Sequence, residues 1–330
     1  MAIIGLRPRR SQRYKEVDIL ESVAEKAGEY GLKVNTWTVC LHNSALIKDN
    51  PELGIQDPYG GIDYNFMCPN NPEARNYMLG LVRDLATNYN IDTIVLESAT
   101  YPWGIIHGDH HEAFDVYLEP FLSSLFSTCF CRYCEEKAKE YGFNLAEARE
   151  VVKGIFEDGV KMPSHILAKI PLEDSYEYYL NTTLELDGVK SLIEYKFKVA
   201  EEVLKEVKGV IKEAGSKVKL AVVTFPKTRL AEGINLSSTS KILDSISFGV
   251  YFDTPQRVYY HVKHAKERIG DRCRLHPIIK ISYPEASSKS TLIEEIVAAK
   301  EAGADGLEFY NYGRTPLENL GWVREGLEII

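Results

Sequence analysis

Short apolar runs rich in β-branched residues alternate with amphipathic helical segments along most of the chain. The predicted strands cover 3–6, 33–41, 91–96, 217–225, 242–252, 274–283 and 304–310. Helical periodicity marks 14–30, 73–89 and about 186–214. Asn71-Pro72 precedes the second helix, which suits a cap followed by proline in the first turn. Near-continuous apolar strands separated by helices predict a parallel sheet with helices on both faces.

The number of strands decides between α/β folds. A (β/α)8 TIM barrel has eight strands, and seven are found here. Either one strand is hidden in a segment interpreted as loop, or the chain lacks or displaces its first strand; we favour the second, because a strand begins at Ile3. The rival doubly wound sheet usually carries a glycine-rich turn after its first strand, where this chain has Arg7-Pro8-Arg9-Arg10. The sequence predicts one barrel domain over 1–330.

The connection after the strand ending at Glu97 is far longer than an ordinary strand-to-helix link. It spans 98–216 and contains a histidine-rich run, a cysteine cluster and several helices. We expect this insertion to lie over the C-terminal mouth of the barrel, where enzymes of this fold keep their sites.

Three cysteines lie within six residues, at Cys129, Cys131 and Cys134, and a fourth, Cys68, lies well before them. Four thiolates complete one tetrahedral zinc shell, so the set predicts a metal site that pins two loops together. The alternative is a group of plain thiols, or a disulfide with a spare cysteine. Intracellular proteins do not normally keep disulfides.

Several acidic residues follow predicted strands directly. Glu97 ends an apolar strand, so its carboxylate is expected to point into the barrel mouth. Asp253 and Glu285 follow later strands, and either could be a second carboxylate. The sequence contains no nucleotide or flavin fingerprint and no Gly-x-Ser-x-Gly elbow.

Polar and aromatic residues gather after the same strands and are candidates for substrate contact. They are His42, Asn43, Tyr101, Trp103, His107, His110, His111, Glu112, Asn311 and Tyr312. Aromatic faces can stack on sugar rings, and imidazoles can orient a substrate, move protons or bind a metal. The alternatives are a hydrated histidine loop with local hydrogen bonds and, at Asn43, a turn closed by its own side chain.

The amino-acid composition restricts the classes of partner and the location that we expect for this protein. A net charge of −9 argues against nucleic acid or an anionic membrane. No run approaches the roughly 20 apolar residues of a membrane span, and the N-terminal apolar run is too short for a signal peptide, so we expect a cytoplasmic protein. Abundant Lys and Glu with only three Gln resemble thermophile proteins. The composition is compatible with a monomer or with a homo-oligomer.

The run Cys68-Pro69-Asn70-Asn71-Pro72-Glu73-Ala74-Arg75, a strand ending in glutamate and a C-x-C-x2-C run resemble the glycoside hydrolase family 42 β-galactosidases. The resemblance implies zinc ligation by Cys68, Cys129, Cys131 and Cys134, and an acid/base role for Glu97. The run from Leu96-Glu97-Ser98 through His107 to Glu112 also resembles a group of uncharacterised glycosidase-like barrel proteins, which carry a leucine-glutamate-serine strand end, a histidine-rich loop and a Cys-Phe-Cys run.

The chain departs from the galactosidases at three points. Leu96 stands where they have asparagine, and a longer insertion precedes the cysteine triplet. Their nucleophile is a glutamate ending strand seven, where this chain has Ser282-Tyr283, with Glu285 slightly beyond. The resemblance therefore does not imply β-galactosidase specificity.

The favoured hypothesis is a glycoside hydrolase acting on a small carbohydrate. Glu97 would protonate the leaving oxygen, Glu285 would be nucleophile or base with Asp253 as substitute, and the zinc would be structural because four thiolates leave no open position. One alternative is a metal-dependent hydrolase or isomerase that uses the loop from His107 to Glu112. The other is a non-catalytic carbohydrate-binding barrel.

Overall fold

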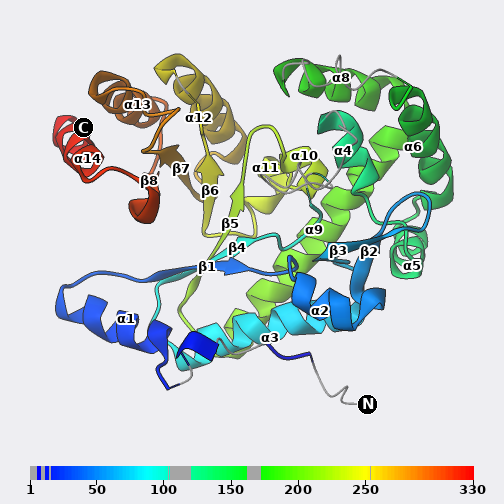
Figure 1. Ribbon diagram of the computed structural model, residues 1–330, viewed down its shortest axis with the longest axis horizontal. Coiled ribbons are helices and arrows are strands. Elements are labelled where there is room, and N and C mark those ends of the chain that lie inside the picture. The colour runs from blue at the N-terminus through cyan, green and yellow to red at the C-terminus, as the bar shows by residue number, and fades with distance from the viewer. Residues whose placement is uncertain are drawn as a thin grey trace.

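A central sheet of six parallel strands organises the molecule, with its strands in the order β1-β4-β5-β6-β7-β8 (Figure 1). The computed structural model describes residues 6–8, 12–14, 16–102, 104, 120–161, 172–252 and 254–330. The strands are Asn35–Val39 (β1), Thr93–Glu97 (β4), Lys219–Thr224 (β5), Ser245–Gly249 (β6), Arg274–Lys280 (β7) and Glu308–Tyr310 (β8). Six predicted strands are thus confirmed, with shorter bounds, while the strand predicted at 3–6 lies, except for Leu6, outside the described residues.

The sheet curls into part of a barrel. In a flat six-stranded sheet the outer strands would lie about 24 Å apart, five spacings of about 4.8 Å. Here the rings of Trp37 on β1 and Tyr310 on β8 have centroids only 6.0 Å apart. Residues at the centre of the sheet are buried on both faces, with every residue of β6 buried. This curled α/β sheet confirms the predicted barrel fold.

Helices cover the outer face of the sheet and extend along one side of it (Figure 1). They are Ile19–Glu29 (α1), Ser44–Asp49 (α2), Pro72–Asn88 (α3), Pro120–Phe126 (α4), Arg132–Glu140 (α5), Leu145–Gly159 (α6), Leu172–Glu185 (α8), Asp187–Glu213 (α9), Arg229–Glu232 (α10), Leu236–Thr239 (α11), Pro255–Ile269 (α12), Lys289–Glu301 (α13) and Leu317–Ile329 (α14). No helix in the described part of the chain is both long and apolar enough to cross a membrane.

The segment between β4 and β5 contains most of the extra helices. Helix α4 packs on both α6 and α8, and α6 and α8 each pack on α9. The helix α9 is the predicted long helix, and it buries a stripe of residues that includes Val199 and Val203 against α3 and α10. The described part of the insertion is therefore joined to the barrel through α9.

A small antiparallel hairpin was not predicted. Strands Gly54–Gln56 (β2) and Ile62–Met67 (β3) form a separate two-stranded sheet, so they are not the missing barrel strands. The Asp57 side chain closes the turn by accepting hydrogen bonds from the backbone N–H groups of Tyr59 and Gly61 at 2.7 and 3.0 Å. Cys68 follows β3 directly, so the hairpin places the first residue of the cysteine cluster.

Asn71 caps α3 as the sequence predicts. Its Oδ1 accepts from the N–H groups of Glu73 and Ala74 at 2.9 and 3.3 Å, and its Nδ2 donates to the Glu52 carbonyl at 3.0 Å. We expect Asn71→Ala to lower the free energy of unfolding by roughly 1–2 kcal/mol through loss of the cap. Urea denaturation measures it, with Asn88→Ala at the last position of the same helix as control. An equal loss in both variants would contradict the capping role.

Candidate active site

A cavity of about 1020 Å³ opens on the concave face of the sheet and is lined by residues from all six parallel strands. Glu97, Gly249 and Tyr310 each end a strand and line it, so the cavity reaches the carboxyl ends of the strands, where barrel enzymes keep their sites. Aromatic side chains dominate its wall. They are Trp37, Phe66, Tyr101, Phe225, Tyr251, Phe252, Phe309 and Tyr310.

Glu97 is the last residue of β4 and lies in the cavity wall. The indole N–H of Trp37, on the neighbouring strand β1, donates a hydrogen bond to Glu97 Oε2. The next residue, Ser98, has φ of 53°, a left-handed conformation that residues other than glycine rarely adopt. Unusual backbone of this kind gathers at functional sites, where the surrounding structure maintains it.

Two more carboxylates face the same cavity. Glu232, at the end of α10, accepts hydrogen bonds from Thr224 Oγ1 and Thr228 Oγ1, each at 2.6 Å. Glu308, which begins β8, accepts from Ser247 Oγ at 2.7 Å, and His276 Nδ1 lies 3.5 Å from the same oxygen. Sequence reasoning missed Glu232 because it lies eight residues beyond β5. Only the folded chain places it in the lining of the cavity.

Burial and neighbouring acidic groups raise the pKa values of two side chains in the cavity, Glu232 and Tyr251. Burial, followed by repulsion from Glu97, raises the pKa of Glu232 to about 7, against the opposing effect of its two threonine hydrogen bonds. Burial also raises the pKa of Tyr251 well above its ordinary value, and Tyr310, Glu97, Glu308 and Glu285 add to the shift. A carboxyl that titrates near neutrality beside another carboxylate is typical of acid/base pairs.

The rest of the wall suits a polyhydroxylated ligand. Tyr251 stacks on Tyr310 with centroids 5.8 Å apart, and Phe225 meets Tyr251 edge-on at 5.3 Å. Asn311 Oδ1 is buried in the lining, and among the described residues it has no hydrogen-bond donor. Aromatic faces beside an amide oxygen of this kind offer stacking and an acceptor for a ligand hydroxyl.

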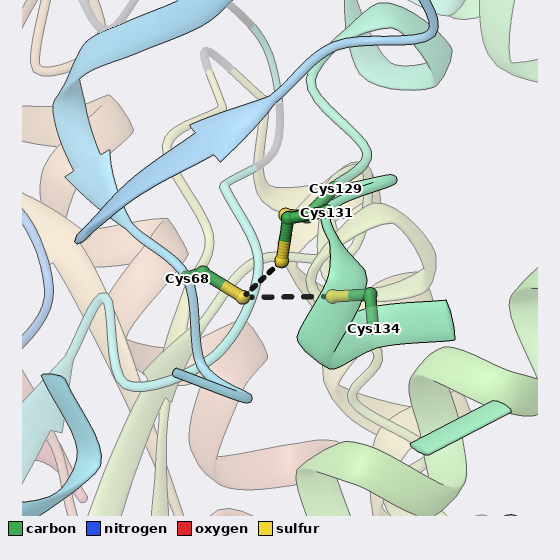
Figure 2. A group of neighbouring side chains, drawn as sticks. All are labelled: Cys68, Cys129, Cys131 and Cys134. Atoms are coloured by element: carbon green, nitrogen blue, oxygen red, sulfur yellow. Dashed lines mark hydrogen bonds between the residues drawn. The ribbon is translucent and has the colours of Figure 1, made fainter. Parts of the chain in front are cut away.

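The four cysteines predicted as ligands lie together, as Figure 2 shows. Their sulfurs are all within 4.8 Å of one another and fully buried or nearly so. Cys68 Sγ lies 3.5 Å from the sulfurs of both Cys131 and Cys134. Sulfurs bound to one zinc ion at 2.3 Å in a tetrahedron lie roughly 3.8 Å apart, so four cysteines in this arrangement could hold a metal ion.

Neighbouring groups donate toward these sulfurs. The backbone N–H groups of Gln56 and Asn70 point to Cys129 and Cys68 at 3.4 Å each, and Asn70 Nδ2 lies 3.3 Å from Cys134 Sγ. Burial raises the pKa of the Cys68 and Cys129 thiols, so a cation would be needed to hold these two as thiolates. The donors and the burial both fit a metal-thiolate centre.

One wall of the cavity touches the cysteine site. The hydroxyl of Tyr101 accepts from Asn70 Nδ2 at 3.1 Å and lies 3.8 Å from Cys134 Sγ. The buried amine of Lys196 lies 5.2 Å from the centre of the Tyr101 ring, and burial lowers its pKa to about 7. Tyr101 therefore links the cysteines to the cavity.

Four other predicted site residues, His42, Asn43, Glu285 and Tyr312, do not belong to the described lining of the cavity. His42 stacks on Phe66 at 4.8 Å, and Asn43 caps α2 by accepting from the Leu46 N–H at 3.1 Å. Glu285 lies after β7 and pairs with Lys280 Nζ at 2.7 Å, while Tyr312 is exposed. Six predicted residues lie outside the described part of the chain: Trp103, His107, His110, His111, Glu112 and Asp253.

Comparison with solved structures supports the fold. A β-galactosidase from Halorubrum lacusprofundi superimposes with a TM-score of 0.59 at 12% identity, covering 96% of this chain and 51% of the other. A GH42 β-galactosidase from G. stearothermophilus gives 0.55 at 12% identity, covering 89% and 43%. An α-L-fucosidase from Paenibacillus thiaminolyticus gives 0.53 at 11% identity, covering 95% and 40%.

The chain spans about half the length, or less, of each of these structures. No protein-family model and no curated protein matches its sequence. At such low identity the likeness concerns the fold alone, and it confirms the predicted TIM-barrel fold.

Proposed function

We propose that the protein is a glycoside hydrolase acting on a small carbohydrate, with Glu97 as a catalytic carboxylate. The observation that carries the proposal is the placement of Glu97 at the end of β4, hydrogen-bonded to Trp37 in an aromatic cavity. The Asn311 oxygen in the same wall, which has no donor among the described residues, would accept from a sugar hydroxyl. The structural neighbours, which are β-galactosidases and a fucosidase by description, agree with this class.

The direct test is turnover of a panel of aryl glycosides by the wild-type protein. The panel includes galactosides and fucosides of both anomers, because those sugars occur in the names of the fold neighbours. Hydrolysis of at least one of them is expected. If the protein binds sugars in calorimetry but cleaves none, the hydrolase proposal is wrong.

A carbohydrate-binding barrel without turnover is the second candidate. The observation that favours it is the ion pair between Glu285 and Lys280, at 2.7 Å, near the end of strand β7. Glu285 lies slightly beyond the strand end where the resemblance places the nucleophile, and its carboxylate is paired with a lysine. Sugar binding without turnover in the panel would support this candidate.

The cysteine site is proposed to hold a structural zinc ion. Cys68, Cys129, Cys131 and Cys134 would supply four sulfur ligands, which leaves no position open for a water or a substrate. The ion would stabilise the junction between the hairpin and α5 rather than take part in the reaction.

Trp37→Phe is expected to lower kcat roughly tenfold to a hundredfold, because it removes one hydrogen bond to a carboxylate and retains most of the ring. Steady-state kinetics on the best panel substrate measure the change. Trp322→Phe, on α14, is the matched control and should retain normal kcat. Unchanged kcat in Trp37→Phe would show that the indole does not orient a reacting Glu97.

A further inference from the structure

We infer that Glu232 is the second catalytic carboxylate of this cavity and that it donates the proton to the departing glycosidic oxygen. The inference rests on the proposed function, and it moves to Glu232 the step that the resemblance gives to Glu97. Glu232 lines the same cavity as Glu97 and interacts with it electrostatically.

The Glu232 carboxyl is held in place at both oxygens. Thr224, the last residue of β5, donates to Oε2, and Thr228, before α10, donates to Oε1, each at 2.6 Å. Two hydroxyls of this kind fix the plane of the carboxyl and can turn to accept when it carries the proton. A fixed donor of this kind meets the geometric need of general acid catalysis.

The backbone that carries Glu232 is also anchored. Thr100 Oγ1 donates to the Glu232 carbonyl at 2.7 Å, and the buried Lys196 donates to the carbonyl of Ala231 at 3.0 Å. Gly233 follows with φ of 80°, and a Cβ there would lie 2.6 Å from the Lys196 carbonyl oxygen, so α10 sits close against α9. These contacts reach Glu232 from the β4 loop and from α9, which is more anchoring than a surface glutamate needs.

In this mechanism the proton leaves Glu232 in the first step and returns to it in the second. Glu232 gives its proton to the glycosidic oxygen, and the electron pair of the breaking bond from the anomeric carbon stays on that oxygen, so the leaving group departs as a neutral alcohol. The Glu97 carboxylate faces the positive charge that develops at the anomeric carbon. Water then bonds to that carbon and returns one proton to Glu232, which restores the acid.

The test compares two glycosides of the same sugar, the one found by the aryl glycoside panel. The dinitrophenyl glycoside has a leaving group that needs no proton, and the methyl glycoside needs one. Glu232→Gln is expected to lower kcat/KM on the methyl glycoside by about 10²–10⁴-fold and to leave the dinitrophenyl glycoside within about tenfold of wild type. Equal losses on both, with normal melting temperature and metal content, would overturn the assignment.

The pH profile gives an independent readout. With Glu232 as the acid, wild-type kcat/KM on the methyl glycoside should fall above about pH 7, where Glu232 loses its proton. The Thr228 hydrogen bond lowers this pKa, so Thr228→Val should move the alkaline limb to higher pH. A limb that does not move in Thr228→Val contradicts the inference even if Glu232→Gln fails to fold.

The proposed hydrolase function and the role of Glu232 are contradicted by different outcomes of this test. If the wild type hydrolyses neither glycoside, the proposed function is wrong and the role of Glu232 falls with it. If the wild type hydrolyses both and Glu232→Gln also cleaves the methyl glycoside normally, the proposed function stands and only the assignment to Glu232 is wrong. The exposed Glu301, on α13, supplies the control substitution Glu301→Gln for both measurements.

Discussion

Glu97→Gln is expected to lower turnover roughly 10³-fold on every glycoside that the wild type cleaves, whether or not its leaving group needs a proton. Glutamine has nearly the same shape and can still meet the Trp37 indole through its amide oxygen. It cannot supply the negative charge that the developing positive charge on the sugar needs. Steady-state kinetics on the methyl and dinitrophenyl glycosides measure both losses.

Glu97 and Glu232 differ in which substrates are expected to lose turnover as well as in the size of the expected loss. A loss on both substrates is expected for Glu97→Gln, and a loss on the methyl glycoside alone for Glu232→Gln. The melting temperature of Glu97→Gln should stay within a few degrees of wild type, and Glu301→Gln should be normal in all respects. Near-normal turnover in folded Glu97→Gln would refute its role and, with it, the reading of the cavity as a hydrolase site.

The second large effect is expected at the cysteine site. Cys134→Ser should reduce bound zinc from one ion per chain to a small fraction and lower the melting temperature on the order of 5–10 °C. A zinc ion held by the four cysteines would stabilise only the folded chain, by about 4 kcal/mol when it is present at a thousandfold excess over its Kd. Elemental analysis and thermal denaturation, with and without chelator, measure the two changes.

Cys273→Ser is the matched control, because Cys273 is also buried but lies outside the cluster. It should keep its zinc, and chelator should lower its melting temperature as much as it does in the wild type. A wild-type protein that carries no metal after expression in zinc-supplemented medium, and whose melting temperature ignores chelator, would show that the four cysteines are plain thiols.

The parts of the fold visible in the sequence are those that local periodicity determines. The strands β4 and β5 are buried on both faces and appear as largely continuous apolar runs, whereas β6, Ser-Ile-Ser-Phe-Gly, is fully buried but alternates serine with apolar residues. The hairpin β2–β3 was not predicted because β2 has only three residues and β3 shows neither a continuous apolar run nor a strict alternation: Tyr64 and Asn65 are exposed side by side, and Phe66 and Met67 are both buried. The curl of the sheet, visible in the contact of Trp37 with Tyr310, depends on packing between distant strands and leaves no local pattern.

The candidate site likewise has some residues that the sequence identifies and others that only the fold identifies. The cysteine spacing predicted a cluster correctly, because ligand geometry demands close spacing in the chain for three of its members. The strand end at Glu97 was also visible. Glu232 was not, since a glutamate in the short helix α10 looks like any surface residue until Thr224, Thr228 and Thr100 are seen around it. Its environment comes from tertiary contacts alone.

The cysteine cluster also constrains the order in which the chain can assemble. Cys68 follows the hairpin, Cys129 and Cys131 precede α5, Cys134 lies in its first turn, and the whole of α3 and β4 lies between Cys68 and the other three. A metal ion bound by all four sulfurs would therefore close a loop that contains α3 and β4. The rate of metal capture in a refolding experiment would report when these distant segments come together.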